Sequence, residues 1–285
     1  MIKHRLVFVG GGNMGSALVG GLLAAGWEPA DIAVVERVPA RVAQLCGLFP
    51  GVTVTGEMVP AEGAVIAVKA YDVGAAAELV VASGARRVLS IAAGISIAAL
   101  DAVFGEGVAV VRGMPNTAAL VGKGAAAIAV GPSSAEADLV WAEEVLGAVG
   151  TVTRVPEAQL DAVTVLAGSG PAYLSLVAES LVDAGVLAGL PRGVSQAVVG
   201  QVFTGYAALL VESGRDPVAL RAEVTSPGGV TAAALRVLEG RGLRSAFLEA
   251  VMAGTERSRE LGQTGVEALG ARLRHPPEAS GRDAT

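Results

Sequence analysis

Three glycines near the N-terminus have the spacing of a phosphate-binding loop. The pattern G-x-G-x-x-G is matched by Gly10, Gly12 and Gly15. Gly10 ends the apolar run 6–10, which is typical of a strand, and the other two glycines follow it. Glu36 ends the next such run, 21 positions beyond Gly15. Glycines with this spacing let the backbone approach a pyrophosphate, whose charge rests on the N-terminus of the following helix. The pattern therefore predicts a dinucleotide-binding site.

Two adjacent residues bear on which dinucleotide this site takes. The Glu36 carboxylate could accept a hydrogen bond from the ribose 2′-hydroxyl of NAD(H), whereas the Arg37 guanidinium could pair with the 2′-phosphate of NADP(H). The sequence leaves both cofactors open.

A second candidate site lies at 225–231, where T-S-P-G-G-V-T precedes the helical pattern AAALRVLE. A Pro-Gly-Gly turn that leads into a helix exposes backbone N–H groups, and Ser226 and Thr231 add hydroxyls. A small carboxylate could be held there without a basic side chain. The alternative is that Ser226 or Thr231 only caps the helix.

Few side chains are available to move a proton. The histidines are His4 and His275, and the lysines are Lys3, Lys69 and Lys123. Reduction of a ketone by a hydride needs a positioned proton donor, and none of these residues lies on a helix of the second half of the chain. A basic imine nitrogen instead arrives protonated, so that binding and orientation can suffice. The residue types therefore predict an imino acid reductase.

Strand and helix patterns alternate over the first half of the chain. The expected strands are at 6–10, 32–36, 52–55, 64–68, 87–91, 108–112, 124–130 and 151–155. Nearly continuous apolar strands separated by helices indicate a sheet that is covered on both faces. We therefore predict an α/β protein with an N-terminal Rossmann-type doubly wound sheet at 1–155. An all-helical domain at 156–270 and a polar, proline-rich tail at 271–285, expected to be disordered, would follow.

One stretch of the helical domain, 193–211, contains no formally charged residue. Its length would also suit a membrane span, but Ser195, Gln196 and Gln201 would be unfavourable in lipid, so we expect a buried helix of a protein outside the membrane. A small domain has too few neighbours to cover such a helix on all sides. An intertwined homodimer would cover the rest.

Composition restricts the partners and the compartment. The net charge is −6, and no stretch gathers Lys or Arg into a stripe that could neutralise several phosphates, so we expect no nucleic acid partner. Cys46 is the single cysteine, and the N-terminal residues do not have the layout of a secretory signal. We therefore expect a cytoplasmic protein.

Several stretches resemble the pyrroline-5-carboxylate reductase family over nearly the whole chain. They are VGGGNMGSAL at 9–18, VIAVKA at 65–70, SIAAGIS at 90–96, RGMPNTA at 112–118, LAGSGPAY at 166–173, GLPR at 189–192 and VTSPGGVTAAALRVLE at 224–239. The last is a family signature. The chain departs from the family pattern in two places. Ala70 and Tyr71 stand where the family reads Pro and a polar residue, and Ala118 follows M-P-N-T where the family reads Pro.

The resemblance implies a function and a set of site residues. The reaction would be NAD(P)H-dependent reduction of 1-pyrroline-5-carboxylate to L-proline, the last step of proline biosynthesis, by hydride transfer to a protonated cyclic imine. Ser226, Gly229 and Val230 would hold the substrate carboxylate, and Thr231 would hydrogen-bond the ring nitrogen. With the residues argued above, the expected cofactor-binding set is Val9, Gly10, Gly11, Gly12, Asn13, Met14, Gly15, Glu36, Arg37, Ala67, Val68, Lys69, Ala70, Ala93 and Asn116. We expect no metal ion.

The family also implies a homodimer, and often a ring of dimers that makes a decamer. Two other functions remain open from the sequence. One is a reductase of a six-membered cyclic imine carboxylate, because one methylene is worth only about 1–3 kcal/mol in discrimination. The other is a dinucleotide sensor that binds the cofactor without turnover.

Overall fold

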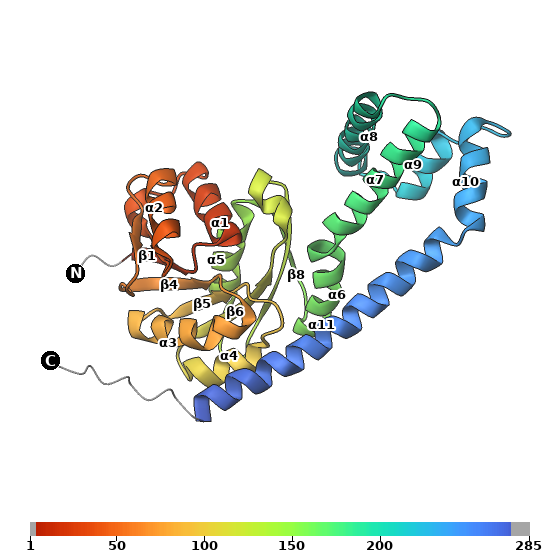
Figure 1. The fold of residues 1–285 in the computed structure, drawn as a ribbon. Coiled ribbons are helices and arrows are strands. Elements are labelled where there is room, and N and C mark those ends of the chain that lie inside the picture. The colour runs from red at the N-terminus through yellow and green to blue at the C-terminus, as the bar shows by residue number, and fades with distance from the viewer. Residues whose placement is uncertain (1–3, 275–285) are drawn as a thin grey trace. The chain divides into compact units, whose positions relative to one another are not determined.

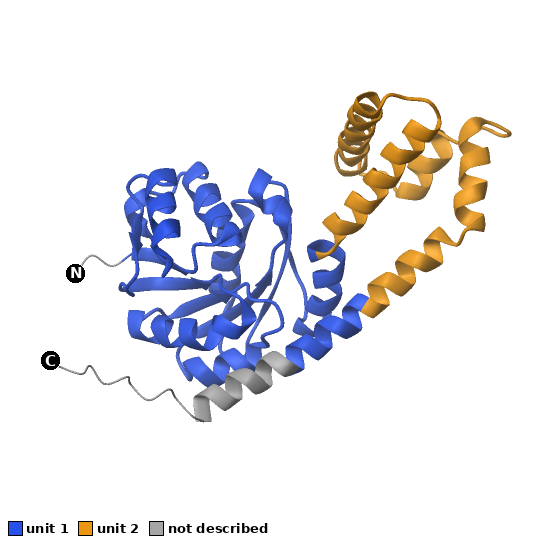
Figure 2. Cartoon of the chain, viewed as in Figure 1, with its two compact units in different colours: residues 1–168, 254–285 blue, residues 169–253 orange. Residues whose placement is uncertain are grey.

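The computed structural model describes residues 4–274, with side chains up to residue 263; the predicted tail at 271–285 lies outside the described residues from position 275 onwards. The chain forms two compact units (Figures 1 and 2). The first comprises Met1–Gly168 with Gly254–Thr285, and the second comprises Ser169–Ala253. The last helix, α11 (Leu243–Arg274), begins in the second unit and continues into the first.

The first unit is built on an eight-stranded sheet in the order β3-β2-β1-β4-β5-β6-β7-β8. The strands are β1 (His4–Val9), β2 (Ile32–Val35), β3 (Thr53–Thr55), β4 (Ala61–Ile66), β5 (Arg87–Ser90), β6 (Ala109–Met114), β7 (Gly124–Val130) and β8 (Gly150–Arg154). All neighbouring strands are parallel except β6 and β7. The doubly wound α/β fold is confirmed.

All eight predicted strands are present, and an end of β1, β4 and β6 lies two or more residues from its predicted position. β4 begins at Ala61, where it pairs with His4, and it ends at Ile66 because Ala67 and Val68 turn against the glycine loop. β6 continues to Met114 because it pairs there with Ala127 of the antiparallel strand β7. The shifts of β4 and β6 come from pairing partners that are distant in sequence.

Helices cover both faces of the sheet (Figure 1). The helices of this unit are α1 (Asn13–Ala24), α2 (Pro39–Leu48), α3 (Val73–Ser83), α4 (Ile97–Phe104), α5 (Glu136–Gly147) and α6 (Leu160–Val163), with short helices η1 (Pro29–Asp31), η2 (Ala70–Asp72), η3 (Thr117–Val121), η4 (Glu157–Gln159) and the π-helical turn η5 (Thr164–Gly168). Helices α1, α2 and α5 pack with Leu6 and Phe8 of β1, whereas α3 and α4 pack with Val7 and Val9. Because successive residues of a strand face opposite helix layers, the residues on both faces of the strand must be apolar.

A partly buried ion pair joins β6 to the segment that follows β8. Glu157 Oε1 accepts hydrogen bonds from Arg112 Nη1 at 3.0 Å and from the backbone N–H of Ile97 at 2.8 Å. The same carboxylate therefore satisfies a largely buried guanidinium and the first turn of α4.

The second unit, Ser169–Ala253, is described in full and contains helices and no strand. Its helices are α7 (Gly170–Leu187), α8 (Arg192–Glu212), α9 (Pro217–Glu223), α10 (Val230–Gly240) and the start of α11. Helices α7 and α8 approach closely at Gly185, where an added Cβ would clash with the Ser195 hydroxyl. That hydroxyl donates to the carbonyl oxygen of Val182 at 2.9 Å.

Most apolar side chains of the second unit are exposed. Ser195 is the one buried residue of α8, and α7 has none among its residues, all of which are described. Val194, Val198, Val202, Tyr206 and Leu209 are exposed at helical spacing along α8. Exposed apolar surface of this extent marks a face that another surface covers. Residues 157–187 and 192–212 are also long and apolar enough to cross a membrane, by length and composition alone.

The fit of β4 beneath α5 generates a stability prediction. A Cβ on Gly63 would lie 2.8 Å from Cζ2 of the buried Trp141 side chain and 3.2 Å from Cγ of Arg87. We expect Gly63→Ala to lower the free energy of unfolding by about 1–3 kcal/mol, because the indole must shift within a packed layer. Urea denaturation measures this.

The matched control is Gly47→Ala in α2, where an added Cβ meets no atom within 4 Å. That variant should be neutral or stabilised by up to about 1 kcal/mol, because alanine favours the helix. Equal stability changes in both variants would contradict the packing argument.

Candidate active site

The predicted cofactor residues gather at one edge of the sheet. The parallel strands β1, β2, β4, β5 and β6 all end there, and the residues of the cofactor-binding set follow or close these strands. β1 lies between β2 and β4, so β2 and β3 are added on one side of β1 and β4 on the other, and the strand order reverses at the carboxyl end of β1. Ligands of doubly wound sheets bind at such a switch point.

Two glycines are required by the tight packing of the loop after β1. Gly10 has φ +105°, and a Cβ there would lie 2.7 Å from the Ala67 carbonyl oxygen and 2.9 Å from Val68 Cγ1. A Cβ on Gly15 would clash with the carbonyl oxygen of Gly10. A larger side chain at either position would push the loop away from α1 or β4.

The N-terminus of α1 is left open for an anion. Gly12 is its N-cap residue and provides no side-chain cap, so the first N–H groups of the helix, beginning at Asn13, have no partner within it. An added Cβ on Gly12 would meet no atom within 4 Å. Free donors beside open space fit the pyrophosphate that the sequence predicts here.

The Glu36 side chain is fixed at the end of β2. Its carboxylate accepts hydrogen bonds from the backbone N–H groups of Gly11 at 3.1 Å, Arg37 at 2.8 Å and Val38 at 3.0 Å. Only the first of these reaches Oε2, which retains accepting capacity for a ribose hydroxyl.

Arg37 is exposed and paired with a carboxylate from another loop. Its Nη2 lies 3.4 Å from Oδ1 of Asp72, in η2 after β4. Ion pairs between exposed side chains contribute about 0–1 kcal/mol, so this guanidinium is free to exchange partners.

Arg41 is a site residue that the sequence reasoning did not identify. From the first turn of α2, its Nε donates to the Gly11 carbonyl oxygen at 2.6 Å, and its Nη2 donates to Ser16 Oγ at 2.7 Å and to the Gly12 carbonyl oxygen at 3.3 Å. Its place five residues after Glu36 was the available signal. Only the fold brings it against the glycine loop.

Apart from Lys69, the other predicted cofactor residues carry no ionisable side chain. Ala67 to Ala70 form the turn after β4, and Ala93 is exposed in the turn after β5. The Asn116 amide is engaged: Nδ2 donates to the Ala167 carbonyl oxygen and Oδ1 accepts from the Ala125 N–H, both at 3.0 Å. Within the described part of the chain, no group of His, Cys, Asp and Glu could hold a metal ion.

The second candidate site begins α10 in the helical unit. The turn closes through the Gly229 N–H, which donates to the Ser226 carbonyl oxygen at 3.1 Å, and Gly228 has φ +69°. Gly229 is the N-cap residue, and no side chain caps the helix. The hydroxyls of Ser226 and Thr231 have no hydrogen-bond partner among the described residues. Neither residue therefore acts as the helix cap.

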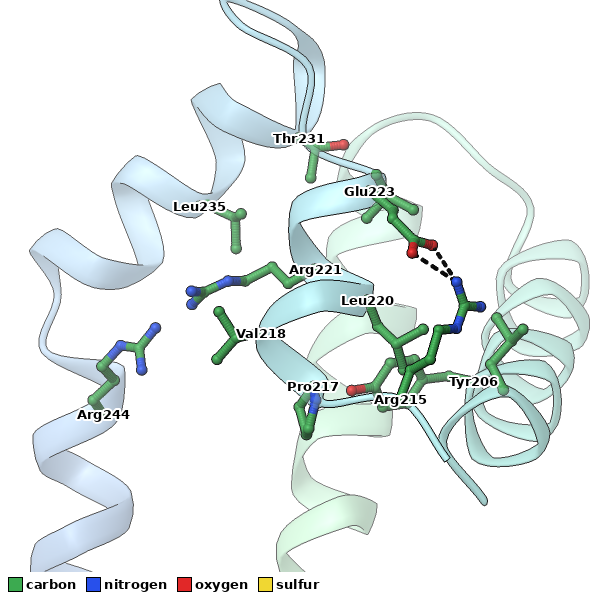
Figure 3. Close-up of a pocket in the computed structure, with 12 residues that line it drawn as sticks. Tyr206, Arg215, Pro217, Val218, Leu220, Arg221, Glu223, Thr231, Leu235 and Arg244 are labelled. Carbon is green, nitrogen blue, oxygen red and sulfur yellow. Dashed lines mark hydrogen bonds and ion pairs between the residues drawn. The ribbon is translucent and has the colours of Figure 1, made fainter. Parts of the chain in front are cut away.

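Thr231 lines a pocket of about 510 Å³ in the same unit (Figure 3). The pocket's arginines are ion-paired: Arg215 contacts both carboxylate oxygens of Glu223 at 2.6 and 2.7 Å, and Arg221 and Arg244 contact Glu239 at 3.5 and 2.7 Å. Hydrogen bonds from Arg244 lower the pKa of the Glu239 carboxyl. The three guanidiniums thus share two carboxylates, and each of them is ion-paired. Of the predicted substrate-binding residues, Thr231 lines this pocket, whereas Ser226, Gly229 and Val230 lie outside its lining.

Two family models match the chain. One, described as pyrroline-5-carboxylate reductase dimerisation, matches residues 157–261. The other, described as NADP oxidoreductase, coenzyme F420-dependent, matches residues 5–94. The first range contains the α10 site and the second contains the glycine loop.

Whole-chain similarity extends these matches. The chain is 40% identical over 266 residues to a pyrroline-5-carboxylate reductase of Corynebacterium melassecola, covering 90% of this chain and 98% of the relative, and 42% identical over 285 residues to one of Mycobacterium tuberculosis, covering 90% and 96%. A solved pyrroline-5-carboxylate reductase of Coxiella burnetii is similar at TM-score 0.85 and 32% identity, covering 91% and 98%. A Plasmodium falciparum pyrroline carboxylate reductase with NADP bound is similar at TM-score 0.78 and 28% identity, covering 92% and 99%. The chain belongs to the pyrroline-5-carboxylate reductase family.

Proposed function

We propose that this chain catalyses the NAD(P)H-dependent reduction of 1-pyrroline-5-carboxylate to L-proline, the last step of proline biosynthesis. The observation that carries the proposal is the start of α10. There, two hydroxyls that have no hydrogen-bond partner in the described part of the chain stand beside helix N–H groups without a side-chain cap, and the relatives of the chain are pyrroline-5-carboxylate reductases.

The substrate carboxylate would bind at the turn that precedes α10. Gly229 and Val230 contribute backbone at the helix N-terminus, where N–H groups and the helix dipole favour a negative charge. The Ser226 hydroxyl adds a donor. The Thr231 hydroxyl accepts a hydrogen bond from the ring N–H and so orients the imine carbon.

The cofactor would lie along the carboxyl edge of the sheet. Residues 9–15 hold its pyrophosphate, while Glu36 and Arg37 face its adenosine ribose. The turns at 67–70 and at Ala93, with Asn116, line the path toward the nicotinamide. The close packing of Gly10 on Ala67 and the open space at Gly12 support this placement.

The chemistry requires little from the side chains. When bound, NAD(P)H would supply a hydride to the carbon of the C=N bond, and the electron pair of that bond would move to nitrogen. Because the imine nitrogen carries a proton on arrival, the product is the secondary amine, and no side chain has to donate a proton. The chain then has to bind the substrate, align its imine carbon with the cofactor and exclude other orientations.

The helical unit would form a homodimer. The apolar stripe of α8 and the exposed side chains Leu174, Leu181, Phe247 and Met252 provide the surface for it. In the functional division that we propose, residues 1–155 bind the dinucleotide and 156–270 form the dimer and hold the substrate. Assembly of dimers into a decameric ring is the further step.

The same surface argues against a membrane location. Polar side chains recur along α8, including Gln196, Gln201 and Thr204, so burial against a second copy costs less than burial in lipid. Cys46 is exposed and is the single cysteine, which suits the reducing cytoplasm.

The direct test is reductase activity of the purified chain. With 1-pyrroline-5-carboxylate present, we expect NADPH or NADH to be oxidised and L-proline to form. The six-membered cyclic imine carboxylate is the control and should give a lower kcat/KM. Tight cofactor binding without turnover of either ring would instead indicate a sensor and would overturn the proposal.

Thr231→Ala should remove an orienting hydrogen bond without disturbing the helix, because this hydroxyl caps nothing. We expect kcat/KM for the imine to fall about 5- to 150-fold, corresponding to about 1–3 kcal/mol. Thr231→Ser retains the hydroxyl and should retain most of the activity. An Ala variant as active as the original chain would exclude Thr231 from the site.

Arg37→Ala should weaken NADPH selectively. A charged hydrogen bond to the 2′-phosphate is worth about 1.5–3 kcal/mol, so the dissociation constant of NADPH should rise about 10- to 150-fold while that of NADH stays constant. Arg86→Ala, an exposed arginine just before the amino end of β5, is the control and should change neither constant. Equal losses of both cofactors in Arg37→Ala would show that Arg37 does not contact the phosphate.

A further inference from the structure

We propose that Arg41 is a positioning residue for dinucleotide binding. Arg41 orients the glycine loop after β1 so that the N–H groups of the loop face the pyrophosphate. The inference rests on the proposed function, because it requires the cofactor to bind at the loop after β1. It adds a residue outside the phosphate-binding pattern itself.

The guanidinium of Arg41 is almost fully engaged by hydrogen bonds. Besides Gly11, Gly12 and Ser16, it contacts Gln44, to whose Oε1 Nη1 donates at 2.5 Å. These bonds use four of the five N–H groups of an arginine. Three of the four acceptors belong to the glycine loop or to the first turn of α1, so Arg41 joins α2 to that loop.

These contacts set the direction of two peptide groups. In a trans peptide the carbonyl of one residue and the N–H of the next point in opposite directions. Because the carbonyl oxygens of Gly11 and Gly12 face Arg41, the N–H groups of Gly12 and Asn13 point away from it. Gly12 has open space around its missing side chain, so an anion can reach these donors.

Glycine gives this loop conformational freedom that the site must restrict. Adjacent glycines such as Gly11 and Gly12 populate many backbone conformations, and most of these would not present both N–H groups together. The Ser16 hydroxyl holds the same carbonyl, because it donates to the Gly12 oxygen at 2.7 Å and accepts from Arg41. Arg41 and Ser16 thus fix the loop before a ligand arrives, which reduces the entropic cost of binding.

Arg41 and Arg37 should therefore act differently on the cofactors. Arg37 is exposed, has one exchangeable partner, and stands ready for the 2′-phosphate that distinguishes NADPH. Arg41 has one N–H group left and orients a loop that contacts the pyrophosphate common to both cofactors. A lysine at 41 would keep the charge but lose the planar fork that reaches several acceptors at once.

The experiment compares the full-length chain with Arg41→Ala, Arg41→Lys and Arg37→Ala. Dissociation constants of NADPH and NADH are measured by cofactor fluorescence, and melting temperatures are measured without cofactor. For Arg41→Ala we expect both constants to rise by the same factor, about 5- to 100-fold, with their ratio unchanged. Arg41→Lys should not restore binding, and Arg37→Ala should change the ratio.

Four results would overturn the role of Arg41: unchanged constants in a folded Arg41→Ala protein, a loss confined to NADPH, recovery of both constants in Arg41→Lys, or a lowered melting temperature with normal affinities. If Arg41→Ala does not fold, Ser16→Ala removes one anchor of the same network and should weaken both cofactors by a smaller common factor; unchanged constants there would likewise overturn the role. Failure of the unmodified chain to bind either cofactor would overturn both the proposed function and this role. The two failures are distinguishable, because failure of the Arg41 role alone leaves cofactor binding by the unmodified chain intact.

Discussion

Both proposed ligand sites depend on helix N-termini whose N–H groups have no side-chain cap. Helix α1 begins after Gly12 and α10 begins after Gly229, and in neither case does a side chain satisfy the first turn. A helix leaves these donors unpaired within itself, and its dipole adds a partial positive charge. An anionic ligand can therefore bind to backbone alone. The proposed pyrophosphate and carboxylate sites would thus use the same physical feature.

This dependence explains how the chain can bind anions with few free cations. At both sites the nearby arginines are occupied: Arg41 by the glycine loop, Arg215 by Glu223, and Arg244 by Glu239. Their hydrogen bonds and ion pairs join the backbone and neighbouring helices. Arg37 is the exception in the cofactor region, because its partner Asp72 comes from a separate loop and both side chains remain partly exposed. A guanidinium held so weakly can exchange partners, which is what discrimination between two cofactors requires.

The helical unit is built differently from the sheet unit. In the sheet, two layers of helices bury both faces, and side chains such as Leu6, Phe8 and Ile66 are completely covered. In the helical unit, α8 buries Ser195 and exposes a row of valines. Such a helix gains its hydrophobic stabilisation only when a second surface covers it. Dimerisation would thus complete the hydrophobic core of the unit that holds the proposed substrate loop.

The sequence alone determined the local features. The eight strands, the glycine loop after β1 and the turn before α10 follow from periodicity and from spacing within about 30 residues, because backbone conformation there is set by near neighbours. Their ends were less predictable: β4 and β6 begin or stop where a distant strand pairs with them.

Only the tertiary structure decided what those local features contact. Contacts between residues that are far apart in the sequence include the antiparallel pairing of β6 with β7, the hydrogen bond from Gly11 to Glu36, the Arg37–Asp72 pair and the contact of Arg41 with Gly11. Asn116 likewise bonds Ala167, 51 positions away. Such contacts arise where parallel strands end at one edge, since folding brings separate loops together there, and no spacing along the chain records which side chains then meet.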